Sequence, residues 1–294
     1  MAQPAPARPQ VVYVMGSGHS GSTILGLTLG NCDGFVYAGE LDNWLTRSGT
    51  SVLGGTERTR FWSEVRKRVA NPEELFGTAS QTHLERASAA LRPESYGVRR
   101  KLRGEWARVT TQLYEALANV SDAPYVIDTA HFPLRARELK RLDGIDLHLI
   151  FLVRDPEQVV HSFTRFMNRH ALAERFARVL SKNLDIWLTH VLSLGVFLRT
   201  PRTRRLFVRH EDFLAEPERV LQAILDLAGS PAATPDLASL RTGFPIQANR
   251  LIASASVSLV SKPHAKPRWG LTRLLQLPWE PIFARLRPRA GGDG

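Results

Sequence analysis

A glycine-rich segment near the start of the chain, residues 16–23 (GSGHSGST), constrains the fold more than any other feature. It follows an apolar run at residues 11–15 and precedes another at residues 24–27, an order that predicts a strand, a tight turn and a helix. A turn of this kind presents backbone N–H groups and the N-terminus of a helix to an anion. The sequence therefore predicts an anion-binding loop.

Two nucleotide-binding patterns overlap in this segment. The P-loop pattern fits residues 16–23, but Ser22 stands where nucleotide triphosphatases carry the lysine that reaches the terminal phosphates. The substitution argues against hydrolysis of ATP or GTP. The GxGxxG pattern also fits, with Glu40 near the position of the acid that binds ribose in dinucleotide enzymes. A P-loop kinase and a Rossmann-type dinucleotide oxidoreductase are therefore alternatives.

A second segment far downstream also points to an anion. The apolar run at residues 146–153 predicts a buried parallel strand, and Asp155 and Pro156 after it are typical of the start of a helix. Arg154 then lies at the carboxyl end of that strand, the edge at which open α/β sheets bind ligands. Its planar guanidinium group suits a phosphate, and Ser162 adds a hydroxyl roughly two helical turns later.

The charge balance allows several polyanionic partners. The 39 Lys and Arg residues outnumber the 28 Asp and Glu residues, giving a net charge of +11, which suits an anionic cofactor, a nucleic acid or an anionic membrane surface. The sequence has no zinc-finger spacing, no aromatic nucleic-acid signature and no heptads, so we expect no nucleic-acid partner. Cys32 is the only cysteine, which excludes an intrachain disulfide and a cysteine metal cluster. We expect no metal site.

The lengths of the apolar segments indicate where in the cell the protein is expected. None reaches the ~18 residues needed to span a bilayer, and residues 1–10 lack the apolar core of a signal peptide. We therefore expect a cytoplasmic protein, with its oligomeric state left open. The tail at residues 271–286 (LTRLLQLPWEPIFARL) is basic and amphipathic, so it could contact a membrane peripherally, although packing on the domain is the favoured interpretation.

Strands alternate with helices along the chain. Strand patterns lie at residues 11–15, 35–40, 125–128, 146–153 and 206–208. They predict a P-loop-like, three-layer α/β/α fold with a central parallel sheet, helical insertions and a C-terminal lid. We expect a disordered tail at residues 1–10 and a single domain at residues 11–294, in which residues 231–294 form the lid and a helical tail. Residues 46–59, rich in Gly, Ser and Thr, predict a mobile loop.

Both anion-binding segments resemble motifs of the sulfotransferases that use 3′-phosphoadenosine 5′-phosphosulfate (PAPS). GSGHSGST is similar to the phosphosulfate loop of that family, and RDPEQVVHS at residues 154–162 is similar to its 3′-phosphate motif, RDPxxVxxS. The resemblance covers most of the chain. It implies transfer of a sulfuryl group from PAPS to a hydroxyl of a small molecule, glycan or lipid. The residues that it implies for the cofactor are Arg154 and Ser162 at the 3′-phosphate, a cradle of Gly18, His19, Ser20, Gly21, Ser22 and Thr23, and Asn249 and Arg250, which resemble a GNxxR element.

The resemblance also suggests a base for the acceptor hydroxyl. AGEL at residues 38–41 resembles the GE step of tyrosylprotein sulfotransferases, in which the matching glutamate is the base, so Glu40 is favoured here. Asp128 and His131 are second candidates, because they lie at the end of the third expected strand.

Two departures from the family pattern remove positive charge. His19 stands where Arg or Lys is usual, and Thr129 stands where many members carry Lys. His19 stabilises a leaving phosphate only when it is protonated or through a neutral N–H. A catalytically weak nucleotide-binding homologue therefore stays open as an alternative to an active enzyme.

Overall fold

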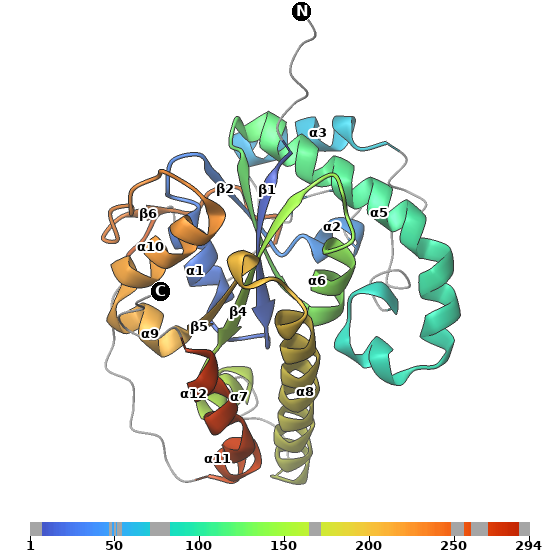
Figure 1. Cartoon of the computed structure of the whole chain (residues 1–294), viewed down its shortest axis with the longest axis vertical. Helices are drawn as coiled ribbons and strands as arrows, with labels where there is room; N and C mark the ends of the chain where they lie inside the picture. The colour runs from blue at the N-terminus through green and yellow to red at the C-terminus, as the bar shows by residue number, and fades with distance from the viewer. Residues whose placement is uncertain are drawn as a thin grey trace, which may run out of the picture.

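Five parallel strands form the centre of the molecule (Figure 1). The computed structural model describes residues 8–46, 49, 51, 55–70, 83–164, 172–247, 256–259 and 270–287. The sheet has the order β2-β3-β1-β4-β5, in which every neighbouring pair is parallel. Its strands are β1 (Gln10–Gly16), β2 (Phe35–Gly39), β3 (Tyr125–His131), β4 (Asp146–Val153) and β5 (Arg205–Arg209). The predicted α/β fold with a central parallel sheet is confirmed.

Helices cover both faces of this sheet, because alternate side chains of each strand point to opposite faces. In β1, Val12 and Val14 pack in one core with α1 (Ser22–Leu29) and α10 (Pro217–Ala228). Val11, Tyr13 and Met15 pack in the other, with α5 (Glu94–Ser121) and α8 (Leu172–Leu198). The other helices of these layers are α2 (Asp42–Thr46), α3 (Thr56–Arg68), α6 (Pro133–Leu139), α7 (Pro156–Thr164) and α9 (His210–Ala215), with 3₁₀ turns η2 (Ala87–Leu91) and η3 (Arg202–Arg204).

Several element boundaries differ from the sequence prediction, three of them at the predicted tail, at β3 and at the predicted mobile loop. β1 begins at Gln10, inside the predicted tail, because the Gln10 N–H donates to the Pro124 carbonyl just before β3. β3 continues beyond Asp128 to His131, which pairs with Met15. Helix α3 begins at Thr56 and so takes four residues from the predicted mobile loop. The longer β3 changes which of its side chains reach the ligand edge.

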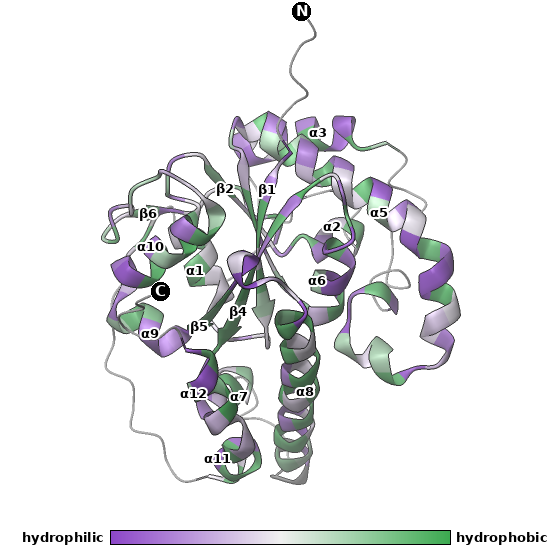
Figure 2. Cartoon of the chain, in the orientation of Figure 1, coloured by the Kyte–Doolittle hydropathy of each residue, from purple (hydrophilic) through white to green (hydrophobic). Residues whose placement is uncertain are grey.

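The C-terminal segment packs on the domain, as favoured. α11 (Leu271–Gln276), η5 (Leu277–Trp279) and α12 (Glu280–Leu286) lie below β4 and β5 in the view of Figures 1 and 2. Trp279 and Phe283 are buried in the core that contains Phe151 and Phe207. A short antiparallel pair, β6 (Leu240–Arg241) and β7 (Ser256–Val257), joins two pieces of the predicted lid. Among the described residues, no helix is both long and apolar enough to cross a bilayer.

The strand order decides where a ligand can bind. β1 lies in the middle with β3 on one side and β4 on the other, so the chain crosses over β1 between β3 and β4. Such a switch point opens a crevice at the carboxyl ends of the strands. The glycine-rich segment after β1 and Arg154 after β4 both lie at this edge. The fold therefore brings together two motifs that are far apart in the sequence.

Candidate functional site

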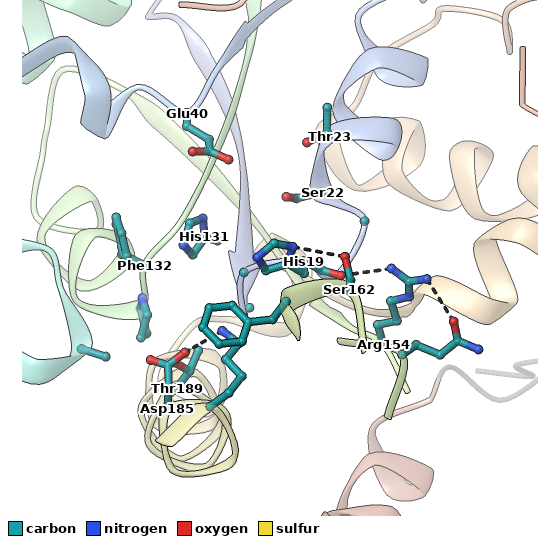
Figure 3. Close-up of a pocket in the computed structure, with 18 of the residues that line it drawn as sticks. His19, Ser22, Thr23, Glu40, His131, Phe132, Arg154, Ser162, Asp185 and Thr189 are labelled. Atoms are coloured by element: carbon teal, nitrogen blue, oxygen red, sulfur yellow. Dashed lines mark hydrogen bonds and ion pairs between the residues drawn. The ribbon is translucent and has the colours of Figure 1, made fainter. Parts of the chain in front are cut away.

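A cavity of about 890 Å³ opens at the carboxyl ends of β1, β3 and β4 (Figure 3). Its volume falls within the range of roughly 300–1,000 Å³ typical of small-molecule sites. The residues that line it come from the glycine-rich segment, the ends of β2 and β3, η2, α7 and α8. They are Gly16, Gly18, His19, Gly21, Ser22, Thr23, Ile24, Glu40, Arg86, Ala87, Ser88, His131, Phe132, Pro133, Arg154, Gln158, His161, Ser162, Phe163, Lys182, Asp185 and Thr189.

The glycine-rich segment needs two of its glycines for steric reasons. A Cβ on Gly16 would lie 2.2 Å from the Leu152 carbonyl oxygen, so no side chain fits between β1 and β4. Gly21 caps α1 in the left-handed region at φ 90°, and a Cβ there would lie 2.3 Å from His210 Nδ1. With these constraints met, α1 begins at Ser22 at the cavity wall. The first N–H groups of a helix have no intrahelical acceptor and are free to bind an anion.

Arg154 and Ser162 lie against the same loop. Arg154 Nη1 donates to the His19 carbonyl oxygen at 3.2 Å, and Nη2 donates to Gln158 Oε1 at 3.3 Å. Ser162 Oγ and His19 Nδ1 form a hydrogen bond of 3.3 Å. The buried Arg154 Nε has no partner among the described residues. The two motifs therefore meet as the sequence predicted, and a guanidinium N–H is left over for a ligand.

Ser20 does not line the cavity. Its hydroxyl is buried and forms a 2.8 Å hydrogen bond with Ser17 Oγ inside the loop, so its contribution is to hold the turn. Asn249 and Arg250, which the sequence also assigned to the cofactor, lie outside the described residues.

Two cavity histidines have unusual backbone and protonation states. His19 and His131 have φ angles of 71° and 55°, a region that non-glycine residues rarely occupy and that often marks functional sites. Burial, and then the nearby positive charges of Lys182 and Arg154, lower the pKa of His19. Burial and Lys182 lower the pKa of His131 to about 4. Both imidazoles are therefore predominantly neutral at pH 7.

Glu40 follows β2 and lines the cavity. Burial, and then the negative charge of Asp128, raise its pKa to about 7, although a hydrogen bond with Asn43 opposes the shift. A carboxylate with this pKa can take up and release a proton near neutral pH, which is what general base catalysis requires. Figure 3 shows Glu40 pointing into the cavity, on the same side as Ser22 and Thr23.

The structure gives Asp128 a different position from the one expected of a base. Its side chain is fully buried and does not line the cavity. Its oxygens accept from Tyr114 Oη at 2.6 Å, Arg135 Nε at 3.1 Å, and the N–H groups of Ala130 and Leu41 at 2.9 and 3.3 Å. A carboxylate committed to four donors supports the fold. It affects the cavity through its negative charge, which raises the pKa of Glu40.

Thr129 also points away from the cavity. It packs against α1, where a Cβ on Gly26 would lie 2.9 Å from Thr129 Cγ2, and its hydroxyl lies 3.4 Å from Tyr37 Oη. Adjacent residues of a strand face opposite sides, so Thr129 lies on the α1 side of β3 and its neighbour Asp128 lies on the side of Tyr114 and Arg135.

Two cationic side chains in the cavity were missed by the sequence motifs. Lys182 reaches it from α8, and Arg86 reaches it from the segment before η2, with its guanidinium carbon 5.9 Å from the centroid of the Phe132 ring. The motifs that the sequence analysis used could not find them, because those motifs flank strands and neither residue does. A single signal was available for Lys182: a lysine with an aspartate three residues later on one helix face.

The comparisons with known proteins cover most of the chain. A family model described as "Sulfotransferase family" matches residues 9–235. The sulfotransferase domain of the curacin biosynthetic pathway superposes with a TM-score of 0.53 at 16% identity, over 92% of this chain and 97% of that domain. The sulfotransferase domain of the Synechococcus PCC 7002 olefin synthase superposes with a TM-score of 0.54 at 19% identity, over 95% and 97%. No curated protein sequence matches the chain.

Proposed function

The chain belongs to the sulfotransferase family, whose enzymes use PAPS as the donor, and we propose that the cavity at the ends of β1, β3 and β4 is its PAPS and acceptor site. The observation that carries this proposal is the meeting of the glycine-rich loop with Arg154 and Ser162 at one cavity. A dinucleotide oxidoreductase or a P-loop kinase has no need of this second motif. The acceptor is a hydroxyl compound.

The residues at the site fit a polyanionic adenosine compound. Gly16 and Gly21 leave no room for a Cβ at their own positions in the loop, and the buried Arg154 Nε has no partner among the described residues. Guanidinium, hydroxyl and helix N-terminal N–H groups are the donors that phosphate and sulfate bind. We assign the 3′-phosphate to Arg154 and Ser162, and the phosphosulfate to the loop at residues 18–23.

When bound, PAPS supplies a sulfuryl group. An acceptor oxygen can attack its sulfur in line with the bond to the leaving phosphate oxygen. The protein then has to orient an acceptor hydroxyl and remove its proton. We assign the role of proton acceptor to Glu40. Its pKa is about 7, so about half of the Glu40 side chains are ionised at neutral pH. His131 lines the same cavity as a neutral imidazole, so it is the alternative acceptor of the proton.

A binding experiment tests the cofactor assignment. We expect 3′-phosphoadenosine 5′-phosphate (PAP) to raise the melting temperature, and NAD and ATP to have no comparable effect. Arg154→Ala should weaken PAP binding by roughly 10–100-fold, the range for losing a charged hydrogen-bond donor. Arg204→Ala is the matched control, because Arg204 pairs with Asp146 at the opposite end of β4. Unchanged PAP affinity in Arg154→Ala would refute the assignment.

A radiolabelled transfer assay separates an active enzyme from a catalytically weak homologue. The protein is incubated with [³⁵S]PAPS and a panel of phenols, sugars, glycans and lipid alcohols, and labelled products are identified by mass spectrometry. We expect transfer to at least one hydroxyl class. PAP binding without transfer to any member would favour the inactive homologue.

Location and membrane contact are part of the same proposal. The exposed side of α11 and η5 presents Leu271, Leu274 and Leu277, and an amphipathic segment with flanking arginines suits a membrane surface. We propose a cytoplasmic enzyme that touches membranes peripherally through this segment. Sedimentation with anionic and neutral vesicles tests the contact, and a Leu274→Ser variant should reduce the pelleted fraction.

A further inference from the structure

Lys182 places a buried ammonium group in the wall of the cavity. Its side chain is only 8% exposed, and its Nζ forms an ion pair with Asp185 Oδ2 at 2.8 Å. The same nitrogen lies 5.4 Å from the centroid of the Phe163 ring. Lysine is seldom buried to this extent unless it is paired. Here both members of the pair line the cavity, and Asp185 is half exposed.

The C-terminal helices hold this part of α8 in place. Asn183, next to Lys182, donates to Thr272 Oγ1 at 3.1 Å, and its carbonyl and side-chain oxygens accept from Gln276 Nε2 at 3.1 and 3.0 Å. One turn later, Trp187 Nε1 donates to the Leu275 carbonyl at 2.8 Å. α11 therefore fixes the rotation of α8 that turns Lys182 toward the cavity.

Sulfuryl transfer calls for a cation at this cavity. In the transition state the transferred sulfuryl group carries negative charge on its equatorial oxygens, and a preorganised positive group beside them lowers the barrier. The two positions at which the family usually has a cation do not supply one: His19 is predominantly neutral, and Thr129 packs against α1. Arg154 is already assigned to the 3′-phosphate, and it also donates to the loop carbonyl and Gln158.

We propose that Lys182 is a catalytic residue that contacts the sulfuryl group of bound PAPS and takes the place of the missing loop and strand cations. The inference rests on the proposed function. As the acceptor oxygen bonds to sulfur, the bridging oxygen keeps the electron pair of the broken bond, and the acceptor proton passes to Glu40. Lys182 keeps its protons throughout. In Figure 3, Asp185 lies on the opposite side of the view from Glu40, with His131 and His19 between them.

The experiment compares two probes that differ only in the sulfuryl group. PAPS and PAP are titrated by calorimetry into the wild type, Lys182→Met and Arg178→Met. Arg178 is the matched control, because it removes one positive charge from the same helix at an exposed position paired with Glu174. We expect Lys182→Met to weaken PAPS binding at least about tenfold, as for a lost charge-assisted hydrogen bond, and PAP binding less than about twofold.

The outcomes separate this inference from the proposed function. If the wild type binds neither probe, the proposed function fails. If it binds both and Lys182→Met weakens them equally, or weakens neither, Lys182 has a structural role and the inference is wrong. Lys182→Gln keeps a polar group in the buried site and gives the same test should the methionine variant fold poorly. Lys182→Arg should recover most of the preference for PAPS, because it restores the charge.

Discussion

Replacing Glu40 with glutamine should stabilise the protein, and the gain should depend on pH. Burial and Asp128 raise the Glu40 pKa from 4.5 to about 7. Between these values the folded protein keeps a proton that the unfolded chain has released, so the free energy of unfolding falls as pH rises. Each pH unit is worth about 1.4 kcal/mol. The raised pKa therefore lowers the free energy of unfolding by about 3 kcal/mol at pH 8, and this decrease is constant at higher pH.

Glutamine has the same shape as glutamate and no charge, so Glu40→Gln removes this loss. We expect the variant to be about 3 kcal/mol more stable than the wild type at pH 8 and less than about 1 kcal/mol more stable at pH 5, where both residues are mostly neutral in the folded protein. Urea unfolding at pH 5, 6, 7 and 8, followed by the fluorescence of the six tryptophans, measures the difference.

Glu64→Gln is the matched control. Glu64 lies on the exposed face of α3, where it pairs with Lys67 and Arg68, so its replacement should bring no gain that grows with pH. If Glu40→Gln is no more stable than the wild type at pH 8, or if its gain is the same at every pH, the raised pKa is wrong. The case for Glu40 as a base near neutral pH would then be lost as well.

The remaining predictions concern turnover and the loop. If Glu40 is the base, kcat/KM for the best acceptor of the panel should rise about tenfold from pH 6 to pH 8; with His131 as the base, whose pKa is about 4, the profile should be flat over that range. Gly16→Ala should destabilise the protein and abolish PAP binding, because its Cβ would clash with the Leu152 carbonyl. Gly97→Ala, with nothing near its added Cβ, should instead raise stability by about 0.5–1 kcal/mol in calorimetry; equal effects of the two changes would contradict the steric argument.

Local sequence patterns predicted the parts of the site that flank strands. The glycine-rich loop follows β1, and Arg154 and Asp155 follow β4. Apolar runs identify such strands, and the carboxyl ends of parallel strands share one edge, so the meeting of the two motifs could be anticipated. The family model supports the same interpretation over residues 9–235.

The parts that the sequence did not predict depend on register and on long-range packing. Asp128 was expected at the end of a strand, but β3 continues to His131 and buries Asp128 against Tyr114 and Arg135. Lys182 reaches the cavity only because α11, about ninety residues further along the chain, fixes the rotation of α8. Neither effect leaves a local pattern, since each depends on residues that are remote in the sequence.

The raised pKa of Glu40 is caused first by burial and then by Asp128, which belongs to a cluster of buried carboxylates behind the cavity. Asp42, Glu85 and Asp128 are all buried, and Arg135 pairs with Glu85 and Asp128. Burial, Glu85 and Glu40 raise the pKa of Asp42 in turn, so one guanidinium group faces several acids. Each acid added to such a cluster makes ionisation of the next more costly. Glu40 is the member that lines the cavity, and the fold therefore holds a proton-accepting group near neutral pH at the place where an acceptor hydroxyl would enter.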